Sequence, residues 1–365
     1  MRLFFDARYI RTDYHDGISR FSQQLAAALA PLAAQAGVEL VFVICDPAQL
    51  DHLPSAAAHV RIHAPTSAKE PFTPAALNRH HPDVVFSPLQ TMGSRGRRYR
   101  LILTLHDMIY YRHRTPPGNL SLGVRMVWRL FHLSYLPQRL TLDGADVVAT
   151  VSETSKRQFA EARLTKRPVI VVPNAPQRLA DLLPEGTEAG GPPRNIVYMG
   201  SFMGYKNVET LVRAMRMLPG RTLHLLSRIS PARRAELEAA AEPEGGAVVF
   251  HDGVSDAEYA RLLSHDAVLA TTSLDEGYGL PIAEALALGV PAVVSDLEIF
   301  HEVAGAGALY VDPHDPGAVA RAVLSLDDAG VRARVAEAGR AHVARFSWDA
   351  SARVLLDAAL RLAAR

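Results

Sequence analysis

Two glutamates, Glu276 and Glu284, stand on either side of the turn Gly-Tyr-Gly-Leu-Pro. The glycines of this turn let the backbone approach a ligand closely, and Pro281 is typical of the first turn of a helix. Such a helix N-terminus attracts anions, because its free N–H groups and its dipole point outward. A sugar diphosphate would suit the site, with its phosphates on the N–H groups and its hydroxyls on the carboxylates. The alternative is an ordinary strand–loop–helix turn with two surface glutamates.

Three further residues could complete a site of this kind. Lys206 offers a fixed ammonium, which would stabilise the charge that develops on a leaving diphosphate. His106 follows an apolar strand, so it should lie at the carboxyl edge of a sheet, where ligands bind. Gly17 begins a helix after a long loop and would permit close approach of a ligand. The alternatives are a solvated loop lysine, a histidine packed under a loop, and a simple helix start capped by Asp16.

These residues need a scaffold, and short apolar runs that alternate with helical patterns predict one. Nearly all-apolar strands in this rhythm are typical of parallel sheets covered on both faces. The first series of strands is expected at 3–5, 38–44, 83–87, 101–105, 147–150 and 169–172, with a helix at 17–32. A linker is expected at 177–194, and a second series of strands at 195–199, 222–226, 247–250, 267–270 and 291–294.

The chain is therefore expected to be an α/β protein with two Rossmann-like domains, at 1–177 and 178–346, and a C-terminal helix at 347–365 that joins the first. A length of 365 residues with 48% hydrophobic and 21% charged residues suits two globular domains. Two such domains that share a cleft would place a ligand at the carboxyl ends of strands in both.

Composition also limits the location of the protein. Cys45 is the only cysteine, which excludes an intrachain disulfide and fits the cytoplasm. Asp6 comes too early for a secretory signal, and no apolar run is long enough to span a membrane. Residues 1–180 carry 22 Lys and Arg against 13 Asp and Glu, and the remainder carries 17 against 25. The basic half could face an anionic membrane or acceptor, or could simply have a solvated arginine-rich surface.

The segment from Glu276 to Glu284, with Ala-Leu-Ala-Leu-Gly-Val-Pro after it, resembles the signature of the retaining glycosyltransferase family 4. The resemblance extends over most of the chain, and the family has the GT-B fold of two facing Rossmann-like domains with a central cleft. The other segments that fit, in order, are Asp6-Ala7-Arg8, 17–21, Leu105-His106-Asp107, 151–155, Val172-Pro173-Asn174, 200–207, 301–305 and Phe346-Ser347-Trp348.

The resemblance implies roles for the site residues. Glu284 would hold the ribose hydroxyls of the donor, and Glu276 would contact the transferred hexose. Gly279 and Leu280 would offer N–H groups to the pyrophosphate, and Lys206 would neutralise the leaving diphosphate. His106 would line the hexose and acceptor side. The remaining donor-side positions are Gly277, Tyr278, Ser201, Gly17 and Arg228.

The sequence departs from the family pattern at two positions. Many members have an arginine where this chain has Ser201, so one cation is missing from the phosphate loop, and Arg228 could replace it. The first loop has a single glycine, Gly17, where many members have two. These departures bear on the pyrophosphate contacts rather than on the glutamate pair.

The predicted activity is retaining transfer of a hexose from a nucleotide sugar to a hydroxyl of a glycan or lipid-linked acceptor, with no metal and no cofactor. Mannose from GDP-mannose is the first choice of donor, and a UDP-sugar is the alternative. A catalytically silent nucleotide-binding scaffold is the rival hypothesis. A nicotinamide oxidoreductase is disfavoured, because no Gly-x-Gly-x-x-Gly follows the first strand. A glycosidase would need neither the phosphate-type helix terminus nor Lys206.

The segment 125–133 is basic and aromatic, with more arginines at 95–100 and 112–114. One hypothesis is peripheral contact of the first domain with an anionic membrane, which would place this cytoplasmic protein at the inner face of that membrane. The alternative is a core helix whose arginines extend to solvent. No nucleic-acid partner is expected.

Overall fold

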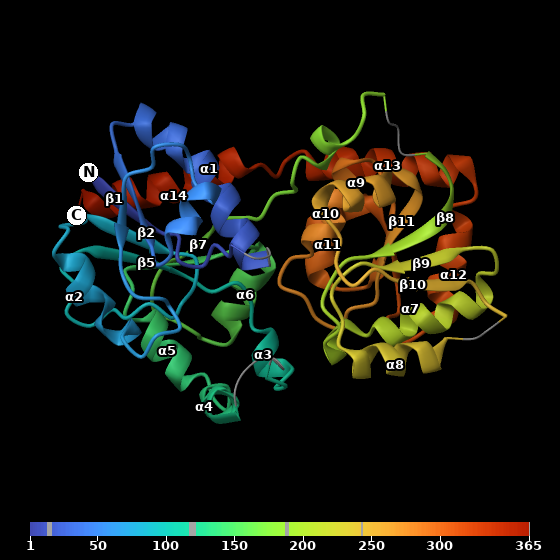
Figure 1. The fold of residues 1–365 in the computed structure, drawn as a ribbon, viewed down its shortest axis with the longest axis horizontal. Coiled ribbons are helices and arrows are strands. Elements are labelled where there is room, and N and C mark those ends of the chain that lie inside the picture. Colours follow the sequence, from blue (N-terminus) through green and yellow to red (C-terminus); the bar gives the residue numbers. More distant parts are fainter. Residues whose placement is uncertain (13–16, 117–121, 187–189, 242–243, 365) are drawn as a thin grey trace. The chain divides into compact units, whose positions relative to one another are not determined.

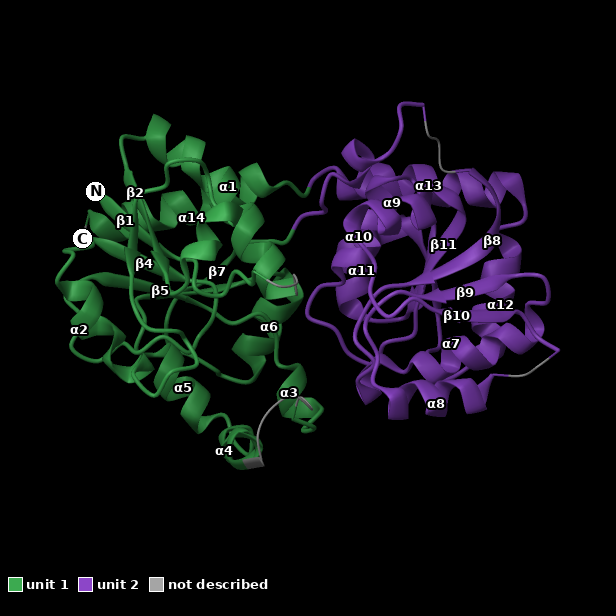
Figure 2. Ribbon diagram, viewed as in Figure 1, with its two compact units in different colours: residues 1–174, 346–365 green, residues 175–345 purple. Residues whose placement is uncertain are grey.

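The computed structural model describes residues 1–12, 17–116, 122–186, 190–241 and 244–364. The chain forms two compact units, which Figure 2 shows in different colours. Unit 1 contains Met1–Asn174 and Phe346–Arg365, and unit 2 contains Ala175–Arg345. No helix in the described ranges combines the length and the apolar character needed to cross a membrane.

Unit 1 is built on a parallel sheet of seven strands in the described chain, in the order β3-β2-β1-β4-β5-β6-β7. The central strands are buried on both faces, as their apolar sequences require. The order reverses at β1, so the switch point lies between β1 and β4. The strands are β1 Arg2–Asp6, β2 Glu39–Ile44, β3 His59–Arg61, β4 Val84–Ser87, β5 Arg100–Thr104, β6 Val147–Thr150 and β7 Val169–Val171.

Helices cover this sheet, and the C-terminal helix α14 packs against α1 (Figure 1). Ser347 caps α14 by accepting a hydrogen bond from the N–H of Ala350. Ser351 on α14 donates to the carbonyl of Pro173 at 2.6 Å, which fixes the returning chain end to unit 1. The helices are α1 Gly17–Gln35, α2 Thr73–Asn78, α3 Ile109–Arg112, α4 Leu122–Phe131, α5 Leu136–Leu142, α6 Glu153–Glu161 and α14 Trp348–Ala363.

Unit 2 repeats this plan with a parallel sheet of six strands in the described chain, in the order β10-β9-β8-β11-β12-β13. Its switch point lies between β8 and β11. The strands are β8 Gly190–Tyr198, β9 Thr222–Leu225, β10 Ala247–Phe250, β11 His265–Thr271, β12 Ala292–Ser295 and β13 Ala308–Val311. The helices are α7 Val208–Ala214, α8 Pro231–Ala240, α9 Asp256–Ser264, α10 Leu280–Ala287, α11 Glu298–Ala304, α12 Pro316–Ser325 and α13 Ala329–Val343.

The two parallel sheets confirm the predicted α/β class, and each predicted strand is present to within a few residues. The expected linker at 177–194 is only partly correct. It contains the 3-10 helix Leu179–Leu182, and its last residues, from Gly190, belong to β8. Strands β3 and β13 were not expected. β3 has only three residues and begins with an exposed His59, so it lacks the apolar run that marks the other strands.

Candidate active site

The predicted phosphate loop and the predicted glutamate loop meet at the switch point of unit 2. Lys206 lies in the loop after β8, and Glu276 lies in the loop after β11. The Lys206 Nζ is 2.5 Å from the Glu276 Oε1, and each side chain is only 14% exposed. Ser273 donates a second hydrogen bond to the same oxygen at 3.0 Å. The structure thus brings together two residues that are 70 positions apart in the sequence, at the place where open α/β sheets bind ligands.

A latch of hydrogen bonds holds these two loops together. The Asn207 side-chain amide donates to the carbonyls of Thr272, at 3.1 Å, and of Pro313, at 2.7 Å. The Thr272 hydroxyl donates back to the Asn207 carbonyl at 2.8 Å, and the Leu274 N–H donates to the Tyr205 carbonyl. Asn207 has a left-handed backbone (φ 50°, ψ 40°), which asparagine tolerates better than most residues. These hydrogen bonds were not predicted from the sequence, although Asn207 directly after Lys206 was a sign of them.

The helix after the glutamate loop, α10, begins as predicted. Gly279 precedes it with a φ of 101°, a value that side-chain-bearing residues rarely adopt. A Cβ on Gly279 would also lie 3.0 Å from the ring of Phe300. In the described chain the N–H groups of Gly279 and Leu280 donate to no recorded acceptor, and no side chain caps the helix. The positive end of α10 is therefore open to an anion.

A small cavity lies beside this helix start. Glu276, Gly279 and the ends of β8 and β11 surround it, so it combines a carboxylate, apolar walls and the helix N-terminus. The lining residues are Met199, Leu269, Ala270, Thr271, Glu276, Gly279, Pro281, Ile282 and Phe300.

Glu284 lies in the second turn of α10 and is only 3% exposed. Its Oε1 accepts a hydrogen bond from the Gln177 side-chain amide at 2.9 Å. The alternative of two surface glutamates is therefore wrong. Tyr278, between the two glutamates, is also buried, and this burial raises the pKa of its phenol. Gln177 was not predicted, because nothing in the sequence links it to a glutamate 107 positions away.

The other donor-side residues of unit 2 lie on nearby loops. Ser201 is exposed, and its carbonyl accepts a hydrogen bond from the Tyr198 hydroxyl at 2.6 Å. Gly200 lies so close to Tyr198 that an added Cβ would be 2.8 Å from the phenol oxygen. Arg228 is exposed on the loop after β9 and lies beside Gly253. Their contacts with a donor remain predictions.

In unit 1, His106 follows β5 as predicted and is half-buried. Its Nε2 is 2.9 Å from the Pro88 carbonyl, and its ring packs edge-on against Phe21 at 5.1 Å. Gly17 is the exposed first residue of α1, and beyond its own helix and chain neighbours no atom of the described residues lies within 4 Å of where its Cβ would be. The proposed cap Asp16, with Tyr14 and His15, lies outside the described residues. His106 and Gly17 belong to unit 1, and the Lys206–Glu276 pair belongs to unit 2.

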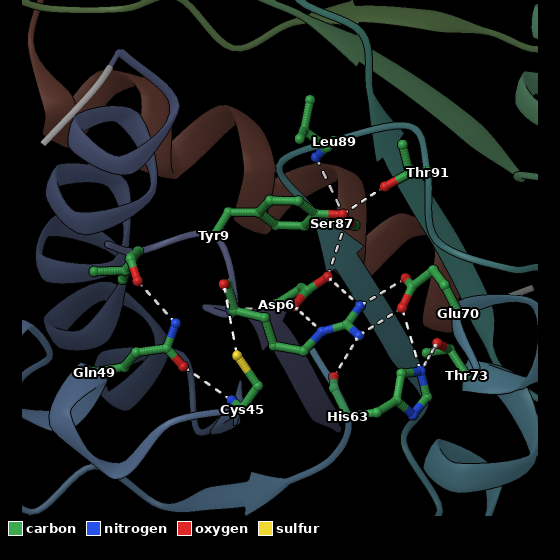
Figure 3. Close-up of polar contacts among 12 residues, drawn as sticks. Asp6, Tyr9, Cys45, Gln49, His63, Glu70, Thr73, Ser87, Leu89 and Thr91 are labelled. Carbon is green, nitrogen blue, oxygen red and sulfur yellow. Dashed lines mark hydrogen bonds and ion pairs between the residues drawn. The ribbon is translucent and has the colours of Figure 1, made fainter. Parts of the chain in front are cut away.

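A buried ionic network lies at the switch point of unit 1 (Figure 3). The Arg8 guanidinium contacts both Asp6 oxygens, at 2.7 and 2.9 Å, and both Glu70 oxygens, at 2.8 and 2.9 Å. The Ser87 hydroxyl donates to Asp6 at 3.1 Å, and His63 lies 3.3 Å from Glu70. Burial alone would lower the pKa of Arg8, yet the two carboxylates raise it well above its usual value.

The network fixes the start of the loop between β1 and α1. Two neighbours add to it: the Tyr9 hydroxyl is 2.5 Å from the Thr91 hydroxyl, and the Gln49 amide donates to the Ile10 carbonyl at 2.8 Å. In the sequence, Arg8 stands out only as part of the segment Asp6-Ala7-Arg8 that resembles the family. Its partner Glu70 is 62 residues away and gave no signal.

Comparisons with known proteins match both units to glycosyltransferase family models. The sequence model of Glycosyltransferase Family 4 matches residues 16–175, and the model of Glycosyl transferases group 1 matches residues 193–328. The chain belongs to the family 4 glycosyltransferases. The N-terminal match lies within unit 1 apart from its last residue, and the C-terminal match lies within unit 2.

Curated relatives carry transferase names. An O-antigen chain mannosyltransferase B from Escherichia coli is 27% identical over 69% of this chain and 68% of its own length. An O-antigen chain mannosyltransferase from Salmonella typhimurium is 41% identical over 22% of this chain and 23% of its own length. A D-inositol 3-phosphate glycosyltransferase from Xylanimonas cellulosilytica is 35% identical over 44% of this chain and 41% of its own length. The chain thus matches less than half the length of the latter two.

Solved structures share the fold of the whole chain. A sucrose-phosphate synthase from Thermosynechococcus elongatus aligns over 100% of this chain and 99% of its own, with a TM-score of 0.74 and 20% identity. An Anabaena protein in complex with UDP-glucose aligns over 98% of this chain and 99% of its own, with a TM-score of 0.68 and 16% identity. The fold of this glycosyltransferase is therefore GT-B.

Proposed function

We propose that this glycosyltransferase transfers a hexose from a nucleotide diphosphate sugar to a hydroxyl acceptor, with retention of the anomeric configuration. The observation that carries the proposal is the meeting of Lys206 and Glu276 beside the open N-terminus of α10. A cation and uncommitted N–H groups suit a diphosphate, and a carboxylate beside them suits sugar hydroxyls.

Unit 2 would contact three parts of the donor: the pyrophosphate, the hexose and the ribose. Its pyrophosphate would accept hydrogen bonds from the N–H groups of Gly279 and Leu280, where the helix dipole adds to the attraction. Lys206 would turn from Glu276 to the phosphates, and Glu276 would then be available to a hexose hydroxyl. Glu284, held by Gln177, would accept hydrogen bonds from the ribose.

In the reaction itself, the bond from the anomeric carbon to the diphosphate oxygen breaks, and a bond from that carbon to the acceptor oxygen forms on the same face. The acceptor proton passes to the departing diphosphate oxygen, so no side-chain nucleophile is required. Lys206 and the helix N-terminus stabilise the charge on the leaving group without a metal ion. Transfer should therefore survive EDTA.

The mannosyltransferases among the relatives support mannose as the transferred sugar, and we propose GDP-mannose as its donor. A protein with the same fold has been solved in complex with UDP-glucose, so a UDP-sugar is the alternative donor. Thermal-shift screening with a panel of nucleotide sugars distinguishes the two, because a ligand that binds only the folded state raises the melting temperature.

Glu276→Ala tests the proposed site. We expect transfer from the donor selected by the panel to fall, because the hexose loses a contact beside the reacting carbon. Glu238→Ala is the matched control, since Glu238 makes an exposed ion pair with Arg234 on α8 and should leave transfer unchanged. Undiminished transfer by Glu276→Ala would place the site elsewhere. A wild-type protein that binds the donor but transfers no sugar to any acceptor would be the silent scaffold.

A further inference from the structure

The helix α4 and the turn after it present an aliphatic face to solvent. Met126, Val127, Leu130 and Leu133 are 59–65% exposed. Met126 and Leu130 are spaced at i and i+4, so they lie on one side of α4, and Leu133 follows in the turn after it. All residues from 123 to 137 are at least partly exposed. The alternative that the segment 125–133 is a core helix is therefore wrong.

Aromatic side chains on another side of α4 attach it to unit 1. Trp128 packs edge-on against Tyr110 of α3 at 5.1 Å, and the His132 ring lies 4.1 Å from that of Trp128. Tyr111 lies 5.0 Å from His132. Burial lowers the pKa of His132, which favours a neutral ring in this contact. The rings therefore fix which side of α4 faces the protein and which side remains uncovered.

The exposed aliphatic surface continues into α5. Leu136 and Leu140, four residues apart, are 59% and 70% exposed. Seven of the thirteen large apolar side chains exposed in the described chain fall between Val124 and Leu140. We call the side chains that form this surface the α4–α5 face: Val124, Met126, Val127, Leu130, Leu133, Leu136 and Leu140. Such a concentration marks an interaction surface rather than the scattered apolar residues of an ordinary exterior.

The charge along the segment that carries the α4–α5 face has one sign. The sequence from Met108 to Leu142 contains five arginines and no Asp or Glu. Arg125 and Arg129 lie on α4 itself, and no carboxylate of the described chain forms an ion pair with either. Aliphatic side chains bordered by unpaired arginines match a surface that is apolar inside and anionic at its boundary.

We propose that the α4–α5 face docks this protein on an anionic lipid membrane, with the aliphatic side chains among the acyl chains and the arginines at the headgroups. A second copy of the chain is a poor occupant, because self-association through this face would bring two such arginine-rich surfaces together. This inference stands independently of the proposed donor and reaction.

Vesicle co-sedimentation tests the proposal. We expect the full chain to bind vesicles of phosphatidylcholine with phosphatidylglycerol, and to bind vesicles of phosphatidylcholine alone much more weakly. The double variant Met126→Glu with Leu130→Glu should bind at least about a hundredfold more weakly, since each of the two buried aliphatic side chains contributes about tenfold or more. Replacing Arg125 and Arg129 with glutamine should weaken binding to the anionic vesicles by roughly fivefold for each charge removed.

The matched control is Met217→Glu with Leu324→Glu, which makes the same kind of change at two exposed side chains of unit 2. It should bind the anionic vesicles as the wild type does. The proposal is overturned if the wild type does not sediment with anionic vesicles, or if the α4 variant binds as well as the control. It is also overturned if sedimentation velocity shows a dimer that the α4 variant abolishes. The nucleotide thermal shift of each variant separates these outcomes from a failure of the proposed donor site.

Discussion

Replacing Lys206 with methionine tests the donor site most directly. The substitution removes the ammonium that lies 2.5 Å from the Glu276 carboxylate and keeps most of the aliphatic stem. Both side chains are 14% exposed, so the pair lies between a surface ion pair and a buried one. Surface pairs contribute about 0–1 kcal/mol, and breaking a buried pair costs about 3–5 kcal/mol. We therefore expect Lys206→Met to lower the free energy of unfolding by roughly 2 kcal/mol.

The loss in activity should be larger than this loss in stability. A fixed donor aimed at developing negative charge is worth about 10²–10³ in kcat, and we expect transfer to fall by that factor. Binding of the nucleoside diphosphate product should weaken by roughly tenfold to a hundredfold, which corresponds to one charge-assisted hydrogen bond. Calorimetry measures the binding and urea unfolding measures the stability. Lys156→Met, in an exposed pair with Glu153, is the control that should change neither.

A double-mutant cycle with Glu276→Gln separates a donor contact from a merely structural pair. If Lys206 binds the diphosphate, Glu276→Gln alone should strengthen diphosphate binding, because the lysine no longer has a competing carboxylate. Adding Lys206→Met should then remove that gain and weaken binding further. If Lys206→Met has no effect on diphosphate binding in the Glu276→Gln background, Lys206 serves only Glu276 and the donor-site reasoning is refuted.

Three further substitutions have expected outcomes. Gly279→Ala should cost about 1–3 kcal/mol in urea unfolding, because φ is 101° and the new Cβ would lie against Phe300, and it should also weaken nucleotide binding in the thermal-shift assay. Arg8→Met leaves two buried carboxylates without their cation, so it should lower the free energy of unfolding by about 3–5 kcal/mol. The control Arg2→Met, in a more exposed pair, should lower it by less than about 1 kcal/mol. Ser201→Arg adds the cation that the family resemblance implies at this position, so it should lower the donor KM. An unchanged KM would mean that the exposed loop position does not reach the phosphates.

The strands of both sheets could be predicted because buried parallel strands need continuous apolar runs. Strand β8 shows where this reasoning fails. Its first residues are Gly190-Gly191-Pro192-Pro193, a composition typical of a loop, and yet Gly190 pairs with His265 of β11. The register shifts between His265 and Ala267, so the glycines extend the strand past an irregularity that no local pattern announces.

The candidate site likewise contains residues that could be predicted from the sequence and residues that could not. Glu276, Glu284 and Lys206 could be predicted, because the loop glycines and Pro281 mark a helix start and the family motif supplies the rest. Gln177 could not, since its contact with Glu284 depends on how the chain folds back across 107 positions. The network around Arg8 was missed for the same reason: a buried cation needs carboxylate partners, but sequence does not show which ones the fold supplies.

If the proposed site binds the donor, the Lys206–Glu276 ion pair would also set the order of events there. Without a donor, each charge is held by the other, so neither is left unpaired in a place where little water reaches it. A diphosphate carries more negative charge than one carboxylate and meets the helix N-terminus as well, so it can take Lys206 from Glu276. The carboxylate would then be released beside the hexose of the bound donor. Nucleoside diphosphate alone should therefore make Glu276 available, and a sugar bound without the diphosphate should find it occupied.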